Sequence, residues 1–193
     1  MAQTSTTLSG EKSHMPTDIT GTDISISTSG TISSTGTALT GSGRLAVRDI
    51  VTITGTTNNN STFTVKEVIS ETEFTVEETI TTGDDADGSS TFTLDMTGFV
   101  TDKAKGDGYY SQPDGVHTVA YQVNATMTGS IKMQGSLATT PTEDDYFDIA
   151  GTTFTADQST LISTANFTGN FVWIRAKATS VTAGTISSVL TNS

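Results

Sequence analysis

The stretch Val-Ala-Tyr-Gln-Val-Asn-Ala-Thr-Met, residues 119–127, decides the fold class of this 193-residue chain. Apolar side chains occupy every second position in it: Val119, Tyr121, Val123, Ala125 and Met127. Because successive side chains of a β-strand point to opposite faces, this alternation predicts a strand with one buried face. Gly129 ends the pattern, and Ile131 and Met133 begin a second alternating run, which predicts an antiparallel partner.

Threonine and serine extend this interpretation to the whole chain. The sequence contains 42 threonines and 22 serines, together 64 of 193 residues. The branched Cβ of threonine fits a pleated sheet and disfavours helix, so the composition predicts an all-β protein.

Composition also excludes several classes of protein. No apolar run approaches the roughly 18 residues of a transmembrane helix, and Met1–Gly10 lacks the basic start and apolar core of a secretory signal. The absence of cysteine excludes disulfides and cysteine-ligated zinc. Nine basic residues against 21 acidic ones give a formal charge of −12, which argues against a nucleic-acid partner.

Alternating segments outline two small antiparallel domains. In residues 44–97 four short runs are separated by polar turns; their apolar residues are Val51 and Ile53, Phe63 and Val65, Phe74 and Val76, and Phe92 and Leu94. They predict a β meander or barrel-like module. Residues 98–193 add the alternating run Phe171–Ala178 and a tight turn at Ala183-Gly184, so we expect an antiparallel β-sandwich of jelly-roll type there.

Residues 1–43 contain almost only threonine, serine and glycine between Thr4 and Gly43, with one strand candidate at Thr22–Thr28. Such a stretch lacks the apolar residues to form a core of its own. We therefore expect an extended arm that stays mobile or lies across a neighbouring subunit.

Candidates for catalysis and metal binding are sparse. His117 has Asp114 nearby, but the sequence has no Gly-x-Ser-x-Gly elbow to supply a positioned serine. Glu143 and Asp145 would share one face of a strand as a carboxylate pair. Asp85-Ala86-Asp87-Gly88 resembles the middle of a calcium loop, but Gly83 and Leu94 stand where its first and last ligands belong. We expect no catalytic, cofactor-binding or metal-binding residues.

Three aromatic residues, Tyr109, Tyr110 and Trp173, are candidates for contact with a partner protein or a glycan. Flat aromatic side chains stack on sugar rings, and they also dominate cores and subunit interfaces. A separate run of eight acidic residues between Glu67 and Asp87, with no basic residue among them, predicts an exposed surface that stays hydrated and repels nucleic acid.

The second half of the chain resembles virion structural proteins of contractile-tailed bacteriophages, especially those of marine cyanophages. The segments that carry this resemblance occur in order: Lys105–Tyr110 (KGDGYY), Asp114–Val119 (DGVHTV), Gly129–Ala138 (GSIKMQGSLA), Pro141–Phe147 (PTEDDYF), Thr168–Ala176 (TGNFVWIRA) and Ala183–Ile186 (AGTI). Tyr146 stands where tryptophan is usual in these proteins. In the first half, Asp49–Gly55, Phe63–Val65 and Phe74–Val76 are similar to a small β module of phage appendage proteins.

This resemblance implies a non-enzymatic virion component that carries no catalytic residues and no cofactor. The expected role is an exterior capsid decoration or head-fibre protein, with a neck, tail or baseplate protein as the alternative. Its expected partners are copies of itself, in a homo-oligomer such as a trimer, and other capsid or tail subunits, with neither nucleic acid nor membrane. A host-surface or carbohydrate-binding module is the alternative from a different class.

Overall fold

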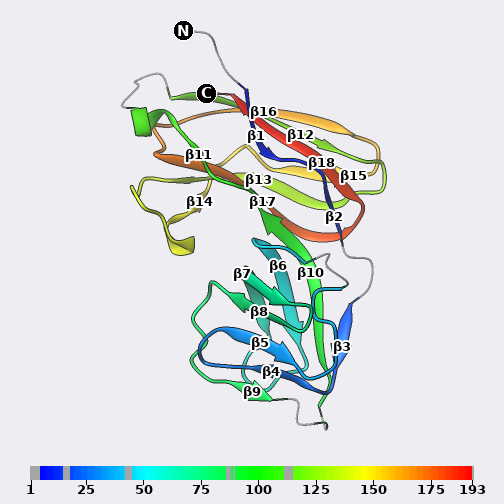
Figure 1. Ribbon diagram of the computed structural model, residues 1–193. Coiled ribbons are helices and arrows are strands. Elements are labelled where there is room, and N and C mark those ends of the chain that lie inside the picture. The colour runs from blue at the N-terminus through cyan, green and yellow to red at the C-terminus, as the bar shows by residue number, and fades with distance from the viewer. Residues whose placement is uncertain are drawn as a thin grey trace. The chain divides into compact units, whose positions relative to one another are not determined.

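Figure 1 shows the computed structural model, which describes residues 5–14, 18–41, 45–85, 88, 90–110 and 115–192. Over these residues the regular structure is β-strand apart from two 3₁₀ helices, η1 (Asp107–Tyr110) and η2 (Glu143–Asp145). The predicted all-β fold class is confirmed. In the described part of the chain, no helix is long and apolar enough to span a membrane.

The chain divides into two compact units. The N-terminal unit is Met15–Phe99, and the C-terminal unit combines Met1–His14 with Val100–Ser193. The structure therefore differs from the arm expected for residues 1–43, because the described residues of that segment are shared between the two units.

The N-terminal unit is built from antiparallel strands. Their bounds are β3 (Ile19–Gly21), β4 (Ile24–Ile26), β5 (Thr31–Ser34), β6 (Asp49–Thr54), β7 (Ser61–Ser70), β8 (Glu73–Val76), β9 (Asp84–Asp85) and β10 (Phe92–Val100). β6, β7 and β8 pair in chain order, as a meander requires, and β10 pairs with β6 on the other side. β5, β4 and β9 continue the sheet beyond β8, and β3 pairs with β10.

The core of the N-terminal unit includes residues that were expected in the arm. Ile24, Ile26, Ile32 and Leu39 are at most 2% exposed and belong to the same cluster as the apolar residues of the meander. β5 reaches β8 with Ile32 directly opposite Phe74. The strand predicted at Thr22–Thr28 is present as β4, but local periodicity misses the core position of Ile32, because this isolated residue is buried only when a strand some 40 positions away pairs with it.

The C-terminal unit contains two antiparallel sheets (Figure 1). Its strands are β1 (Ser5–Ser9), β2 (Lys12–Ser13), β11 (Ala104–Lys105), β12 (Val116–Val123), β13 (Thr128–Ser136), β14 (Phe147–Asp148), β15 (Phe154–Asp157), β16 (Ile162–Thr168), β17 (Trp173–Ala183) and β18 (Thr185–Asn192). Sheet A has the order β1-β18-β12-β16, with β2 also paired to β18. In sheet B, β13 pairs with β14, β15 and β17, and β11 pairs with β17.

The two sheets bury their alternating residues against each other, as in a sandwich. Along β12 buried and exposed residues alternate, and Tyr121 is fully buried. The Tyr121 ring stacks on Phe154 of sheet B at a centroid distance of 6.2 Å, and its hydroxyl donates a hydrogen bond to the carbonyl of Thr152 at 2.8 Å. The sandwich-like architecture of this half follows from these contacts.

The first strand of the chain completes sheet A instead of forming an arm. β1 pairs with β18, placing Thr7 opposite Leu190, and β2 pairs with the start of the same strand. Leu8 is 3% exposed and is the one apolar side chain of β1. A strand with one buried apolar residue gives too little periodic signal for sequence analysis to recognise.

Candidate functional site

The three predicted contact residues, Tyr109, Tyr110 and Trp173, lie together on the C-terminal unit. Lys105 of β11 is paired with Trp173 at the start of β17, and η1 carries both tyrosines immediately afterwards. The backbone between them lies so close to residues 170–171 that a Cβ on Gly106 would be 2.5 Å from the Phe171 carbonyl oxygen, and one on Gly108 would be 2.3 Å from that of Asn170. The sequence Gly-Asp-Gly is therefore required for this close approach.

The aromatic rings contact one another edge to face. The Tyr109 ring centroid lies 5.3 Å from that of Trp173 and 5.2 Å from that of Tyr110, at interplanar angles of 62° and 74°. Both tyrosines are exposed, at 44% and 57%, whereas Trp173 is half-buried and donates its indole N–H to the Thr139 carbonyl at 3.1 Å. Trp173 thus packs against Tyr109, which in turn packs against Tyr110.

Two lysines complete this group, which we call the lysine–aromatic cluster: Lys103, Lys105, Tyr109, Tyr110 and Trp173. The Nζ of Lys105 lies 4.0 Å from the Tyr109 ring centroid, and the Nζ of Lys103 lies 4.7 Å from that of Trp173. A side-chain hydrogen bond with Tyr109 raises the pKa of Lys105, against an opposing effect of burial, so this group is cationic at neutral pH. Within the described residues, neither ammonium group forms an ion pair.

The chemistry of the lysine–aromatic cluster suits an anionic partner. Aromatic faces supply apolar contact and sugar stacking, and exposed ammonium groups supply charge and hydrogen-bond donors. In a chain of net charge −12, Lys103 and Lys105 are two exposed cations that form no ion pair with a carboxylate of the described residues. Sequence analysis identified the aromatic residues but missed the lysines, although the spacing Lys-x-Lys before Gly-Asp-Gly was visible.

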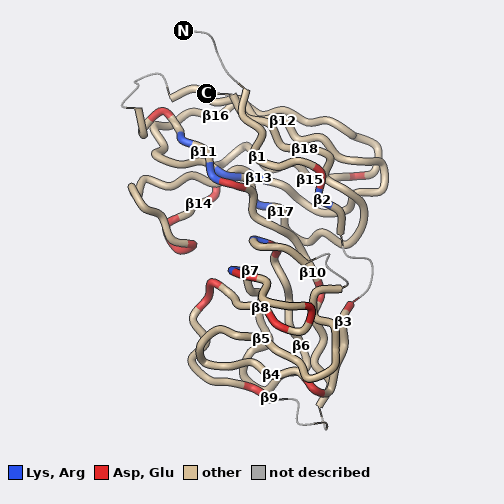
Figure 2. Tube along the Cα trace, in the orientation of Figure 1, with Lys and Arg blue, Asp and Glu red and all other residues tan. Residues whose placement is uncertain are grey.

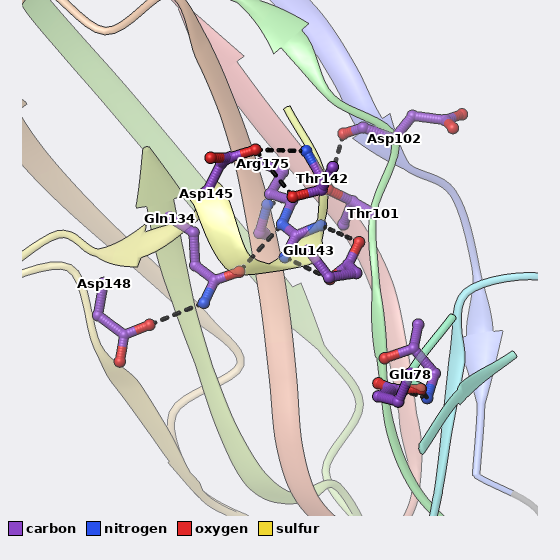
Figure 3. A network of polar contacts seen from close by, with 11 residues as sticks. Glu78, Thr101, Asp102, Gln134, Thr142, Glu143, Asp145, Asp148 and Arg175 are labelled. Carbon is purple, nitrogen blue, oxygen red and sulfur yellow. Dashed lines mark hydrogen bonds and ion pairs between the residues drawn. The ribbon is translucent and has the colours of Figure 1, made fainter. Parts of the chain in front are cut away.

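A second polar group, the Arg175 network, lies further along β17 (Figure 3). Arg175 is only 4% exposed, and its guanidinium donates to both carboxylate oxygens of Glu143, at 2.6 and 2.7 Å. Its Nε donates to the Gln134 side chain at 3.0 Å, and its Cζ lies 3.5 Å from the Tyr146 ring centroid. The loop that follows β13 is thereby attached to sheet B by a bidentate ion pair.

Asp148 and Asp145 extend this network along the same loop. Asp148 accepts hydrogen bonds from Gln134 and Lys132; burial alone would raise its pKa, but these bonds and the charges of Lys132 and Lys177 lower it overall. The backbone N–H and hydroxyl of Thr142 both donate to Asp145, at 2.7 and 2.8 Å, and lower its pKa. These carboxylates act as fixed acceptors that hold the loop.

The carboxylate pair considered for glycoside hydrolysis has a different structural setting. Glu143 and Asp145 lie in η2 and not in a strand. Each carboxylate is occupied by contacts within the loop or with Arg175. Sequence analysis missed the ion pair because Arg175 follows Glu143 by 32 positions.

His117 is fully buried and stacks on Phe167 at a centroid distance of 5.0 Å. Its Nε2 donates to the Gly169 carbonyl at 3.2 Å, since a carbonyl only accepts, and its Nδ1 has no partner among the described residues. Asp114, the residue considered as its triad partner, lies outside the described residues. His117 has the packed, hydrogen-bonded setting of a structural residue.

The calcium-like loop falls largely outside the described residues, which exclude Asp87 and the side chain of Asp85. The neighbouring Asp84 carboxylate accepts hydrogen bonds from the backbone N–H groups of Thr57 and Asn58 and from the side chain of Asn59. Across the described ranges, no group of three or more His, Asp or Glu side chains is arranged to hold a metal ion.

Sheet A has an outward face without charge. Its four main strands, β1, β18, β12 and β16, contain no Lys, Arg, Asp or Glu, and Figure 2 shows them uniformly without charged positions. Exposed positions on this face carry hydroxyl, amide or apolar side chains: Ser5, Thr7, Val116, Thr118, Gln122, Ile162, Thr164, Asn166, Thr168 and Leu190. The sequence of each of these four strands shows that it lacks charged residues. That the four strands lie side by side in one sheet follows only from the fold.

No protein-family model matches the chain, and no curated protein is significantly similar to it in sequence.

Proposed function

We propose that the chain is a structural component of a tailed-phage virion, placed on the exterior of the capsid as a decoration or head-fibre protein. The observation that carries this proposal is the uncharged outward face of sheet A. Because none of its four main strands carries a charged side chain, this face loses little hydration energy when another subunit covers it. An assembly surface needs this property.

The distribution of charge supports an exterior position. Three acidic side chains and one lysine lie on the β7–β8 hairpin of the N-terminal unit, where Glu67, Glu71 and Lys66 are exposed and Glu73 is half-exposed. Such a surface stays hydrated and repels a packaged genome. The segments that resemble contractile-tailed phage proteins support the virion assignment, and a jelly-roll order for the C-terminal sheets is part of this proposal. A neck, tail or baseplate position is the alternative within the same class.

The test is the protein content of purified particles. Virions of the phage that carries the gene are purified on a density gradient and their proteins are quantified by mass spectrometry. We expect the chain in a fixed stoichiometry to the major capsid protein, and immunogold labelling on the head. Labelling confined to the neck or tail would select the alternative position, and absence of the chain from the particle would overturn the proposal.

A second candidate function is recognition of an acidic glycan on a host surface, and the lysine–aromatic cluster favours it. Its exposed rings, and ammonium groups that form no ion pair within the described residues, match a sugar that carries a carboxylate or sulfate. A glycan array with the wild-type chain and Tyr110→Ala, Lys103→Gln and Lys105→Gln variants tests it, with Lys66→Gln of the N-terminal unit as the charge-matched control. Binding that is absent, or unchanged in the three cluster variants, would refute this function.

A further inference from the structure

β16 leaves one edge of sheet A without a partner strand. It pairs with β12 through seven consecutive residue pairs, from Val116 opposite Thr168 to Gln122 opposite Ile162, with no bulge. Among the described residues no strand pairs with its other side, so β16 is the last strand of the sheet (Figure 1). A regular edge strand offers a row of backbone N–H and C=O groups to any strand that approaches it.

The other edges of the described structure are protected from such pairing. β11 and β14 are two residues long, β9 is two residues long and consists of aspartates, and β3 has three residues. β15 has four residues and ends with Asp157, while β1, at the opposite edge of sheet A, is interrupted by a bulge between Thr7 and Ser9. Charged residues, proline and bulges are the usual protections of an edge strand. The seven residues of β16 include no charged residue, no proline and no bulge.

Apolar side chains are exposed beside this edge. Ile162 is 61% exposed, Leu161 45% and Val116 56%. Leu161 and Ile162 mark the start of β16, and Val116 lies opposite its last residue. Exposed apolar groups at both ends of an open edge are expected where that edge is covered in the assembled protein.

We propose that β16 pairs antiparallel with β16 of a second copy of this chain, about a twofold axis through Ala165. This register places Ile162 opposite Thr168 of the other copy and Thr164 opposite Asn166. All four of these side chains are on the exposed face of sheet A, so the pairing keeps the outward and inward faces of both copies aligned. The β1-β18-β12-β16 paths of the two copies then join as one continuous sheet, and none of these strands carries a charged residue.

The sequence of β16 is self-complementary in this register. Thr164 and Asn166 meet twice across the axis, and the same pair of residue types already forms a hydrogen bond within sheet A, where the Thr118 hydroxyl donates to the side-chain amide oxygen (Oδ1) of Asn166 at 2.9 Å. Two copies of a chain with net charge −12 repel each other, so they associate most readily through a surface without acidic groups. The uncharged edge meets that requirement, which is why a second copy is the occupant we propose.

Charge substitutions at the paired positions test the register. Thr164→Lys with Asn166→Lys brings lysines opposite lysines twice across the axis, and we expect the dimer dissociation constant to rise by about tenfold or more. Thr164→Lys with Asn166→Glu instead brings lysine opposite glutamate twice, so the dimer should be retained. The control is Thr153→Lys with Thr155→Lys at the β15 edge, where two exposed threonines receive the same charges.

Sedimentation equilibrium of the full chain measures the dimer constant of each variant, and circular dichroism with Trp173 fluorescence verifies that each variant is folded. A wild-type chain that remains monomeric up to about 1 mM would overturn the proposal. The same conclusion follows if the double-lysine variant dimerises as the wild type does, if the lysine–glutamate variant loses the dimer, or if only the β15 variant loses it.

This inference rests on the assembly role proposed above, and the two fail separately. A chain that is present in virions but monomeric in solution overturns the edge pairing alone. A dimer that responds to the substitutions as expected but is missing from virions overturns the virion role and leaves the pairing standing.

Discussion

Replacing Glu143 with glutamine tests whether the Arg175 network holds the C-terminal unit together. Glutamine has nearly the same shape but no charge, so the guanidinium of Arg175, whose side chain is 5% exposed, loses its counter-ion and one acceptor. Breaking a fully buried ion pair on one side costs about 3–5 kcal/mol. The Glu143 side chain is 33% exposed and water reaches it, so we expect a smaller loss of about 2 kcal/mol.

The assay is urea unfolding followed by fluorescence. Trp173 is the only tryptophan of the chain and lies two residues before Arg175 in β17, so its emission reports the unit that contains the network. A probe that is specific to the C-terminal unit is needed, because a chain of two units need not unfold in one step. We expect Glu143→Gln to lower the midpoint with little change in the slope m.

Asp148→Asn is the matched control. It removes a carboxylate from the neighbouring strand β14, but its ion pair with Lys132 has side chains that are 27% and 51% exposed. Exposed pairs of this kind contribute about 0–1 kcal/mol, and salt weakens them. If Glu143→Gln loses no more stability than Asp148→Asn, or if the loss disappears in 1 M salt, the reasoning from burial is refuted.

Three further predictions concern single side chains. Gly106→Ala puts a Cβ 2.5 Å from a backbone carbonyl oxygen, so Trp173 emission should change and the unfolding midpoint should fall, whereas Gly10→Ala, with open space around it, should leave both unchanged. Tyr121→Phe removes a buried donor, and urea unfolding should show a loss of about 1 kcal/mol; an equal midpoint would contradict the hydrogen bond. Backbone N–H donors lower the pKa of Asp157 to about 2, so its contribution to stability is present above its unfolded pKa of 3.8 and is lost as pH falls toward 2; Asp157→Asn should flatten the pH dependence of the urea midpoint there.

Alternation of apolar residues predicted the fold class and several of the strands. Val51 with Ile53, and Phe63 with Val65, lie in neighbouring strands of the meander as expected. The opening run at residues 119–127 was only partly correct, because β12 ends at Val123. The side chain of Asn124 accepts hydrogen bonds from the N–H groups of Thr126 and Thr185 and turns the chain there. Ala125, which the alternation placed on the buried face, is exposed in this turn, whereas Met127 is buried beyond it.

Long-range pairing accounts for most of what the sequence analysis missed. The pairing of β5 with β8, and of β1 with β18, joins segments about 40 and about 185 positions apart. The lysine–aromatic cluster likewise depends on β11 meeting β17, which places Lys105 opposite Trp173. The residue types indicated which side chains could contact a partner protein or a glycan. Which of these side chains lie next to each other is determined by the pairing of the strands.

The uncharged face of sheet A shows why threonine is ambiguous in such a sequence. Thr164 of β16 and Thr155 of β15 both occupy exposed positions that alternate with less exposed ones along their strands, so both face outward. Their surroundings differ, because Thr155 has Asp157 two positions along its strand, whereas the strands around Thr164 carry no charge. An exposed threonine beside charged residues remains hydrated, while one in a wide uncharged face can be covered at little cost in hydration. A surface that serves assembly is therefore recognised from the strands that surround each threonine, and only the topology supplies those neighbours.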